Sequence, residues 1–387
     1  MSTEASQGRT EMSIPFHIPF YDDDDAAALT SALRAGKLVG DGPNTERASG
    51  VLRALLGVRH VLLTTSCTHA LELAMMALNL KPGDEVVVPS FTFVSTTNAV
   101  LRERARCVFV DIRPDTLTMD PGDLERRISK RTKAILPVVY AGVSPEMDAL
   151  MALARARGIC VVEDAAQGVC ATYKGRPAGT SGDMGCFSFH ETKNYSTGEG
   201  GAFVTNDDGF AQRAEIIREK GTNRKQFLLG LVDKYTWVAT GSSFLPPDSM
   251  AALLVSQLDK REIIQRRRKE IHDRYGLSFT ELVQQGRIAV PTIPDSVVSN
   301  HHIYYVLMEN ETVRNRALAF FRQRGIGTTF HYLPLHLSPV GRSMGYHEGD
   351  FPVTESVCGR LLRLPIYPSL TGEQQADVIR TMHEFFA

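Results

Sequence analysis

The sequence predicts an α/β protein built around a mainly parallel sheet. From about residue 58 onward, short apolar and β-branched runs alternate with longer stretches of helical periodicity. The runs are apolar along their whole length, which is typical of strands that helices cover on both faces. A chain of 387 residues is also long enough for about two domains. We therefore expect a large domain that contains the sheet, followed by a smaller one.

The N-terminal region begins with a polar segment, and residues 1–12 predict a disordered tail. Residues 22–25 are four consecutive aspartates, and they precede a helical stretch that ends at Gly36. Carboxylates are stabilised at the positive end of a helix, and glycine commonly follows its last turn. A metal site is not expected there, because neighbouring side chains on a helix point in different directions. The pattern predicts a solvated helix start.

The next part of the chain alternates strands and helices. We expect strands at residues 60–63, 85–88, 107–111, 134–139 and 160–164. We expect helices at residues 69–78 and 145–157, and another that follows the strand at 85–88 and ends near residue 102. In a parallel sheet of this kind, ligands gather at the carboxyl ends of the strands.

A long helix is expected from residue 248 to about residue 275. Its charged run, residues 260–270, contains several arginines, which predict a solvated or interface face. The formal net charge of -1 gives no electrostatic support for binding nucleic acid or an anionic membrane. Residues 276–387 alternate shorter strands and helices. We therefore expect the large domain to span residues 13–255 and the smaller C-terminal α/β domain to span residues 256–387.

The composition indicates a cytoplasmic protein. Its six cysteines form no C-x-x-C pair and no zinc-ligand spacing, and several lie in apolar runs, as reduced core thiols do. The N-terminus lacks the apolar segment of a secretory signal. No run approaches the roughly 18 apolar residues of a membrane span.

Three common cofactor signatures are missing. No G-x-G-x-x-G follows the first strand, no G-x-x-x-x-G-K-[ST] occurs, and no tyrosine is followed four residues later by lysine. Dinucleotide, P-loop and short-chain hydride-transfer functions therefore lose their usual support.

A different phosphate site is predicted at residues 64–68, T-T-S-C-T, between a strand and a helix. Backbone N–H groups and hydroxyls there would converge on the positive end of the helix, where anions bind well. Taken alone, the same residues are also ordinary helix caps.

Two charged residues extend this pattern. Asp164 ends a buried strand, where a carboxylate needs a cation or several donors, although a cap role is equally compatible with its position. Lys193 lies between the apolar run C-F-S-F and a glycine cluster. An amine in a desolvated site has a lowered pKa and can attack a carbonyl carbon to form a Schiff base. A phosphate cradle, a buried carboxylate and a reactive lysine together favour pyridoxal 5'-phosphate as the cofactor.

The chain resembles the DegT/DnrJ/EryC1/StrS family of sugar-nucleotide aminotransferases from about residue 13 onward. The resemblance rests on the stretches G-K-L-V-G-D-G-P, L-L-T-T-S-C-T-H-A-L-E, V-V-P-S-F-T-F-V-S-T, V-V-E-D-A-A-Q-G-V, C-F-S-F-H-E-T-K-N-Y, I-I-R-E-K-G-T-N-R and F-H-Y-L-P-L-H. It implies a pyridoxal-phosphate-dependent aminotransferase of fold type I, whose large domain has a mainly parallel seven-stranded sheet flanked by helices.

The resemblance also implies roles for individual residues. Lys193 would bind the cofactor covalently and then move the proton, and Asp164 would pair with the pyridine nitrogen. The remaining cofactor contacts would be Gln167 on the ring hydroxyl, Cys67, Thr68 and Ser188 on the phosphate, and Phe93 stacked on the ring. The expected substrate contacts are Lys220, Asn223 and Arg224 on the nucleotide diphosphate and His331 near the sugar, although a core position for His331 is weighed evenly.

The implied reaction moves an amino group from L-glutamate to C4 of a dTDP-4-keto-6-deoxyhexose, for a glycan or an antibiotic, in a homodimer whose active sites lie at the subunit interface. Both C4 epimers of the product stay open. The alternatives are a C3 aminotransferase, a dehydratase and, more remotely, a non-catalytic pyridoxal-phosphate-binding regulator. Lys193 argues against the dehydratases, which resemble this chain but carry histidine at that position.

Leu245 departs from the family pattern. Many relatives have at this position an asparagine that reaches the cofactor phosphate of the partner subunit. In this chain Ser242, Ser243 or backbone atoms would make that contact instead.

Overall fold

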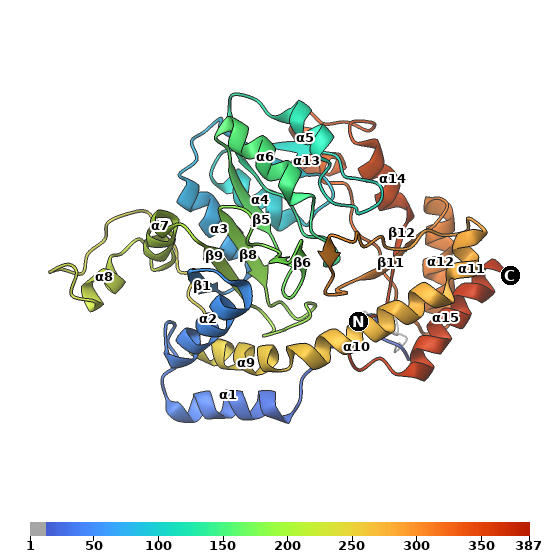
Figure 1. Cartoon of the computed structure of the whole chain (residues 1–387), viewed down its shortest axis with the longest axis horizontal. Helices are drawn as coiled ribbons and strands as arrows, with labels where there is room; N and C mark the ends of the chain where they lie inside the picture. The colour runs from blue at the N-terminus through green and yellow to red at the C-terminus, as the bar shows by residue number, and fades with distance from the viewer. Residues whose placement is uncertain (1–12) are drawn as a thin grey trace, which may run out of the picture.

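The computed structural model describes residues 13–387, and the fold is built around a central seven-stranded sheet (Figure 1). The predicted tail, residues 1–12, lies outside the described residues. The strand order is β1-β9-β8-β5-β4-β2-β3. The strands are β1 (His60–Thr64), β2 (Glu85–Pro89), β3 (Arg106–Val110), β4 (Thr132–Ile135), β5 (Cys160–Asp164), β8 (Met184–Ser188) and β9 (Gly201–Thr205). Strand β9 runs antiparallel to both of its neighbours, while the other six share one direction. Their carboxyl ends therefore meet at a single edge.

Helices cover both faces of this sheet. One face packs against α3 (Cys67–Leu78), α4 (Val94–Arg102) and α7 (Asp208–Arg218). The other packs against α2 (Pro43–Leu56) and α9 (Asp248–Asp259) at one end, and against α5 (Pro121–Arg127) and α6 (Met147–Arg157) at the other. In β1, Leu62 enters the first core while Val61 and Leu63 enter the second, which explains why the strand is apolar throughout. The predicted α/β class with a mainly parallel sheet is confirmed.

The predicted strand at residues 134–139 is shorter than expected. Strand β4 ends at Ile135, and the chain then continues irregularly, with a single bridge from Val138 to Asp164. This departure from the ladder delivers residues 138–141 to the carboxyl edge of the sheet.

The helix that follows the four aspartates, α1 (Asp23–Ala35), begins and ends as predicted. Asp22 caps its first turn, and Gly36 adopts φ 71° in the left-handed region after its last residue. The prediction of a solvated start is wrong for part of the run. Asp25 is 3% exposed, and both Asp22 and Asp25 accept hydrogen bonds from the ammonium of Lys260. These carboxylates therefore connect the start of α1 to Lys260, a residue more than 230 positions later in the chain.

The long helix expected from residue 248 to about 275 is broken in two, α9 and α10 (Arg261–Ser278), and Lys260 is the residue between them. The break places the Lys260 ammonium against the start of α1. The prediction of a solvated or interface arginine face also fails at Arg268, which is 1% exposed and donates to the carbonyls of His301 and His302. Helices α9 and α10 run one after the other beneath the sheet in Figure 1.

The C-terminal part of the chain has its own apolar core. It is built from α10, α11 (Thr280–Gln284), β11 (Tyr304–Leu307), α12 (Glu311–Gln323), β12 (Leu361–Leu364) and α15 (Gly372–Phe386), with Ile14 from the N-terminal end. Strands β11 and β12 form a separate antiparallel pair. The shorter elements are β6 (Thr172–Tyr173), β7 (Arg176–Pro177), α8 (Arg224–Leu228), β10 (Val297–Val298), a 3₁₀ turn at Leu335–Leu337, α13 (Pro339–Ser343) and α14 (Pro352–Arg360). The domain boundary at residues 255/256 stays a prediction.

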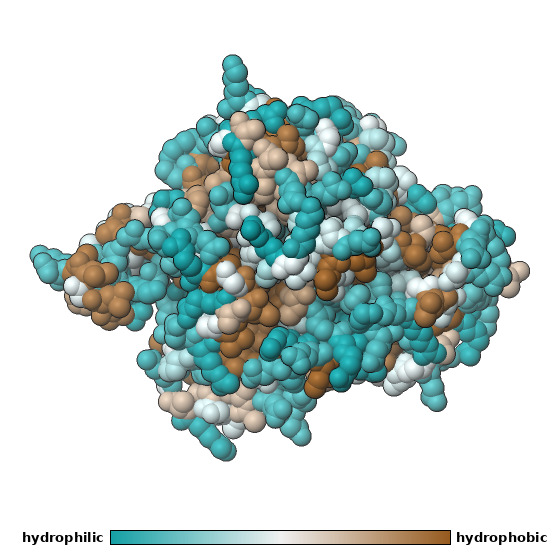
Figure 2. Space-filling model, viewed as in Figure 1, coloured by the Kyte–Doolittle hydropathy of each residue, from teal (hydrophilic) through white to brown (hydrophobic). Residues whose placement is uncertain are grey.

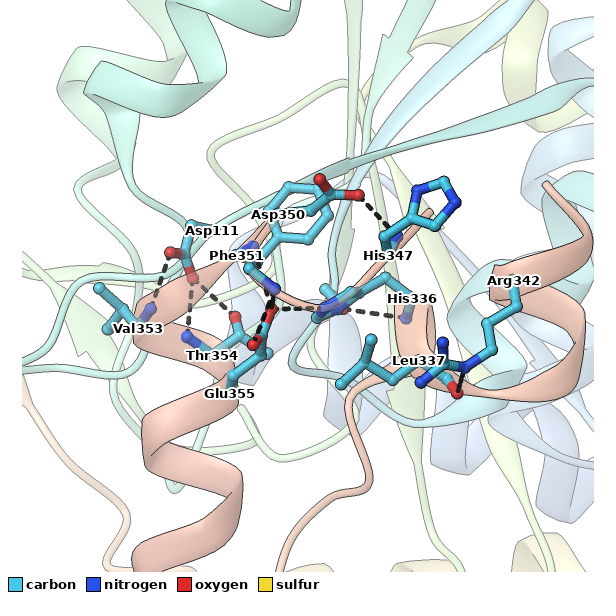
Figure 3. A network of polar contacts seen from close by, with 12 residues as sticks. Asp111, His336, Leu337, Arg342, His347, Asp350, Phe351, Val353, Thr354 and Glu355 are labelled. Atoms are coloured by element: carbon cyan, nitrogen blue, oxygen red, sulfur yellow. Dashed lines mark hydrogen bonds and ion pairs between the residues drawn. The ribbon is translucent and has the colours of Figure 1, made fainter. Parts of the chain in front are cut away.

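A buried polar chain fastens the C-terminal part to the carboxyl edge of the sheet (Figure 3). Ser90, directly after β2, exchanges hydrogen bonds with the backbone N–H and the Nδ1 atom of His336, at 3.2 and 2.7 Å. The Nε2 atom of His336 lies 2.9 Å from Glu355, and the imidazole is fully buried. Asp111, directly after β3, accepts from the backbone N–H groups of Val353 and Thr354 at the start of α14. We call the Ser90–His336–Glu355 chain the latch.

An arm containing α8 projects from the body of the protein at the left of Figure 1, and its apolar side chains form the brown region at the left of Figure 2. The exposed apolar residues of this arm are Phe227, Leu228, Leu229, Leu231, Tyr235, Trp237 and Val238. Within residues 13–387, no helix combines the length and apolar character needed to cross a bilayer.

Candidate active site

A cavity of about 350 Å³ opens at the carboxyl edge of the sheet. Its wall includes the start of α3 after β1, Asp164 at the end of β5, and Lys193 in the loop between β8 and β9. The C-terminal part closes it with residues from β12 and the segment before the 3₁₀ turn. The parallel strands therefore deliver to one place three residues far apart in sequence.

The first turn of α3 forms an anion cradle. Ser66 is the N-cap and accepts from the His69 N–H, which leaves the N–H groups of Cys67 and Thr68 without intrahelical acceptors. The Thr68 hydroxyl lies 2.8 Å from that of Ser95 at the start of α4. A Cβ at Gly201 would lie 2.5 Å from the Cys67 nitrogen, so only glycine lets β9 run this close to the cradle.

Asp164 presents a buried carboxylate to the cavity. It is 4% exposed and accepts from the Thr96 hydroxyl at 2.8 Å and from the Ala166 N–H at 3.1 Å. Burial raises its pKa, while these two hydrogen bonds and the charge of Lys193 act in the opposite direction. No ion pair compensates it among the described residues. A protonated ring nitrogen would supply the missing partner.

Lys193 lies in the tight loop between β8 and β9. Its N–H donates to the His190 carbonyl, and the loop closes when the Glu191 N–H donates to the Gly198 carbonyl. Desolvation lowers the pKa of the Lys193 amine, with nearby Cys67 and Asp164 raising it and Arg363 lowering it further. A neutral amine is the form that attacks a carbonyl carbon.

The other residues predicted to touch the cofactor also line this cavity. The Ser188 hydroxyl accepts from the His190 N–H at 3.3 Å. Gln167 accepts from the Ala141 N–H at 2.6 Å, and its amide lies 3.4 Å from the Tyr332 hydroxyl. The Phe93 ring borders the cavity and is 58% exposed. Lys193, Asp164, Gln167, Ser188, Phe93, Cys67 and Thr68 are thus brought together.

His331 lines the same cavity rather than an apolar core. Its ring stacks on Tyr332 at 4.1 Å between centroids, and its Nδ1 atom lies 3.3 Å from the Tyr140 hydroxyl. The Nε2 atom accepts from Arg363. Burial, with added repulsion from Arg363 and Lys193, lowers the pKa of His331 to about 2. The imidazole is therefore neutral at physiological pH.

Lys220, Asn223 and Arg224 lie elsewhere. Asn223 and Arg224 border a second pocket between α2, α7 and α8, and neither they nor Lys220 line the cavity that holds Lys193. Lys220 and Arg224 approach Glu219 at 3.7 and 3.6 Å, and the Asn223 side chain bonds to backbone atoms of residues 234 and 236. The Ser242 N–H and carbonyl are engaged by Ile217 and Lys220 of the same chain.

Several cavity residues were missed by sequence reasoning. The most informative are Thr96, which binds Asp164, and Arg268, Arg363 and Tyr332 from the C-terminal part. The hydroxyl run S-T-T at residues 95–97, next to the predicted stacking position, was a usable signal for Thr96. The others depend on how the two parts of the chain pack together.

The arrangement fits pyridoxal phosphate. The open N–H groups at α3 suit a phosphate, the uncompensated carboxylate suits a pyridinium nitrogen, and the buried amine suits an aldehyde. These features define a pyridoxal-phosphate-dependent aminotransferase of fold type I. A model of the DegT/DnrJ/EryC1/StrS aminotransferase family matches residues 19–383, and the chain belongs to that family.

Comparisons with individual proteins agree with this assignment. The chain is 34% identical over 379 residues to the spore coat polysaccharide biosynthesis protein SpsC of Bacillus subtilis, and the match covers 96% of each chain. Among solved structures, the sugar aminotransferase Spr1654 of Streptococcus pneumoniae superposes with a TM-score of 0.89 at 28% identity, covering 96% of this chain and 97% of that one. DesV of S. venezuelae gives a TM-score of 0.86 at 33% identity over 94% of both chains.

The comparisons also support the cofactor. Spr1654 has been solved in PLP and PMP forms, which are the two states that an aminotransferase cofactor takes. The protein is a PLP-dependent sugar aminotransferase that takes an amino donor and a sugar acceptor.

Proposed function

We propose that this enzyme transfers the amino group of L-glutamate to C4 of dTDP-4-keto-6-deoxy-D-glucose. The product is a dTDP-4-amino-4,6-dideoxyhexose for a glycan or an antibiotic. The observation that carries the proposal is the convergence of Lys193, Asp164 and the α3 anion cradle on one cavity.

The choice of sugar is supported by the motifs. The stretches that carry the family resemblance, among them F-H-Y-L-P-L-H and V-V-P-S-F-T-F-V-S-T, contribute cavity residues such as Phe93 and His331. SpsC carries a name that refers to polysaccharide biosynthesis, which is compatible with an amino sugar destined for a glycan.

Each cavity residue has a definable task. When bound, pyridoxal phosphate supplies an aldehyde carbon for the amino group and a ring that withdraws electrons from that carbon. Cys67, Thr68 and Ser188 hold the phosphate, and Asp164 keeps the ring nitrogen protonated. Lys193, with its lowered pKa, anchors the cofactor and accepts or donates the proton at the reacting carbon.

The sugar side of the cavity is assigned to His331, whereas Phe93 is assigned to the face of the cofactor ring. Neutral His331 is held by Tyr140 at Nδ1 and by Arg363 at Nε2, so its ring forms part of the cavity wall without adding charge beside Lys193. Gln167 is fixed by the Ala141 N–H and supports the ring hydroxyl of the cofactor.

A homodimer completes the proposal. Lys220, Asn223 and Arg224 lie outside the cavity of their own chain, so they contact a bound nucleotide diphosphate only if the partner's cavity is brought to them. Ser242 or Ser243 would then take the place of the asparagine that many relatives carry at the position of Leu245.

The purified holoenzyme provides a direct test. Its visible absorption band should bleach on adding L-glutamate and return on adding dTDP-4-keto-6-deoxyglucose, and NMR of the product should show nitrogen at C4. The same spectrum assigns the gluco or galacto configuration. A band that ignores glutamate but responds to the sugar would indicate a dehydratase, and nitrogen at C3 would indicate the other aminotransferase.

Replacement of Lys193 tests its role. Lys193→Ala should retain cofactor through the phosphate cradle, but it should show no borohydride-reducible bond and no turnover. Lys130→Ala, which removes an exposed lysine, is the control and should resemble the wild type. Borohydride labelling of a lysine other than residue 193 would contradict the assignment.

A further inference from the structure

The residue that follows Lys193 is held by groups from the C-terminal part of the chain. Asn194 is 7% exposed, and the two ends of its side-chain amide have different partners. Its Nδ2 atom donates to the Asn300 carbonyl at 2.9 Å, and its Oδ1 atom lies 2.8 Å from Nδ1 of His302. The loop that carries the reactive amine is therefore fastened directly after Lys193.

These two contacts fix which nitrogen of His302 carries the hydrogen. A backbone carbonyl can only accept, so the Nδ2 end of the Asn194 amide faces Asn300 and the Oδ1 end faces His302. Because an amide oxygen also only accepts, the hydrogen is on Nδ1 of His302. Burial lowers the pKa of His302 well below its usual value, and the charges of Lys193 and Arg268 lower it further. The ring is therefore neutral, and it donates its N–H to Asn194.

The backbone of His302 is held as well. Its carbonyl accepts from Arg268 at 2.6 Å, and its N–H donates to Oδ1 of Asn300 at 3.1 Å. The Asn300 amide nitrogen donates in turn to the carbonyls of Gln167 and Val169, both at 2.8 Å. The segment that contacts the Lys193 loop is therefore attached to the wall of the cavity on several sides, and its imidazole has a defined position.

The two nitrogens of His302 offer different roles. The Nδ1 atom bonds to the loop that carries Lys193. The ring also lines the cavity, and within residues 13–387 its Nε2 atom has no hydrogen-bond partner. The first nitrogen therefore acts on the protein itself, whereas the second is available to a ligand.

The position of the Lys193 backbone decides where its amine can reach. A lysine amine lies at the end of a flexible four-carbon stem, and a misplacement of about 1 Å can slow a reaction by about 100-fold. The tether at Asn194 is buried, whereas the bond from His17 to the Glu191 carbonyl lies at an exposed site. A buried hydrogen bond is electrostatically stronger than an exposed one. The contact between Asn194 and His302 is therefore well suited to fix this backbone.

We propose that His302 is a positioning residue for the reaction. By donating from Nδ1 to Asn194, it fixes the backbone from which the Lys193 amine reaches the cofactor. The proposal rests on the role of Lys193 in the aminotransferase function above and adds a residue that directs this lysine.

The test separates cofactor binding from the attack of Lys193, using the full-length apoenzyme. Pyridoxine 5'-phosphate has the phosphate and ring of the cofactor but an alcohol in place of the aldehyde, so it binds without reacting. Its affinity, measured by calorimetric titration, reports on the cavity alone. With saturating pyridoxal phosphate, the rise of the visible band reports the step that joins the Lys193 nitrogen to the aldehyde carbon and releases water. Borohydride reduction and peptide mapping confirm which lysine has reacted.

Two replacements of His302 distinguish its nitrogens. The amide nitrogen of asparagine can take the place of Nδ1, whereas glutamine extends to the place of Nε2. His302→Asn should therefore keep a rate close to that of the wild type, and His302→Gln should slow the covalent step by about 10- to 100-fold. Both should bind pyridoxine 5'-phosphate as the wild type does. His347→Gln, at an exposed histidine, is the matched control.

Replacement of the acceptor gives an independent check. Asn194→Leu should slow the covalent step at least as much as His302→Gln. The double variant should be no slower than Asn194→Leu alone, because both changes remove the same hydrogen bond. Far-UV circular dichroism and the affinity for pyridoxine 5'-phosphate show that each variant is folded.

Three results would overturn the proposal. A loss of pyridoxine 5'-phosphate affinity as large as the loss of rate would mean that His302 only maintains the cavity wall. A fast His302→Gln variant with a slow His302→Asn variant would assign the role to Nε2. Unchanged rates in every variant would show that Lys193 does not depend on this contact. Failure of the wider function looks different, since neither amino donor nor sugar enters the assay, and a wild-type protein without a borohydride label on Lys193 would contradict the assignment of the lysine itself.

Discussion

Asp164 keeps a charge inside the protein with only two hydrogen bonds. The Thr96 hydroxyl and the Ala166 N–H partly offset its burial, yet its pKa is still raised above the usual value for an aspartate. A raised pKa in the folded state means that the ionised carboxylate destabilises the cofactor-free protein at neutral pH. Asp164 is therefore suited to the cofactor-bound protein, although it destabilises the cofactor-free protein.

Asp164→Asn should separate these two effects. The amide keeps the shape and can accept from Thr96, so the cofactor-free variant should unfold at a higher temperature than the wild type at neutral pH. Turnover should fall by about 100-fold or more, because the ring nitrogen loses a fixed charge in a water-poor site. Differential scanning calorimetry of the apoprotein and steady-state assays check the two arms. A lower melting temperature with full activity would contradict both.

At the scale of single residues, sequence reasoning located the groups that follow strands. Each of them ends a strand or lies at the start of the helix that follows one, so strand order brings them to one edge; they are Cys67, Thr68, Phe93, Asp164 and Ser188. Arg363 could not be found in this way. It belongs to β12, which forms a two-stranded sheet with β11 apart from the central sheet, and its place in the cavity depends on how two separate cores pack.

At the scale of elements, the latch connects the C-terminal part to the loop that carries Phe93. Ser90 precedes Phe91, which packs against Tyr140 and Tyr332 at 4.8 and 5.2 Å between centroids. The Nδ1 atom of His336 bonds to the Ser90 hydroxyl, and its Nε2 atom bonds to Glu355, which lies beside it in Figure 3. The position of the stacking loop therefore depends on α14, the helix that carries Glu355.

Removal of the latch should weaken the cofactor site. His336→Ala leaves the Ser90 hydroxyl and the Glu355 carboxylate without their partner, and should lower the free energy of unfolding by about 2 to 4 kcal/mol. It should also raise the dissociation constant for pyridoxal phosphate, which an absorbance titration measures. Arg342→Ala is the control, since Arg342 is an exposed neighbour. Unchanged cofactor affinity in a destabilised His336→Ala protein would restrict the latch to a purely structural role.

The helix break at Lys260 shows where element boundaries escape prediction. The sequence from residue 248 to 275 contains no proline and no glycine; the next glycine is residue 276. At the break, Lys260 forms ion pairs with Asp22 and Asp25, more than 230 residues earlier in the chain. A contact of this range leaves no local signal.

At the scale of the whole molecule, the arm around α8 exposes more apolar surface than a monomer needs. Trp237 is 75% exposed and is the single tryptophan of the sequence. Exposed apolar clusters of this kind mark interaction sites. In the homodimer predicted from the family resemblance, the partner subunit would cover this apolar surface of the arm.

The tryptophan is a built-in reporter for that dimer. Its emission should shift to shorter wavelength as the protein concentration rises through the dimer dissociation constant. Leu231→Asp on the arm should give a monomer by light scattering, whereas Leu277→Asp, at an equally exposed leucine of α10, should not. Emission typical of solvent-exposed tryptophan at every concentration would exclude the arm from the interface.

Buried histidines make the fold sensitive to acid. Burial lowers the pKa of His272 to about 3, and those of His17 and His301 to about 4. An unfolded chain protonates these rings below about pH 6.5, so it takes up more protons than the folded chain does as the pH falls. Each such histidine costs about 1.4 kcal/mol of stability per pH unit below that point.

The melting temperature of the apoprotein should therefore fall steadily from pH 6.5 to pH 5. His272→Gln should reduce the slope by close to one proton, since its ring packs against His301 and Tyr304 and burial is the main cause of its lowered pKa. Scanning calorimetry at several pH values checks this. A flat profile across that interval would show that these rings are charged in the folded state.

The pairing of β1 with β9 has a consequence for biosynthesis. Residues 60–64 lie at the edge of the sheet and find their partner in residues 201–205, and the anion cradle follows the first of these strands while Lys193 precedes the second. A nascent chain emerging from the ribosome therefore carries half of the cofactor site long before the other half is synthesised. We therefore expect pyridoxal phosphate to bind only after these two distant segments have paired. It would then bind late in folding and stabilise a nearly complete fold.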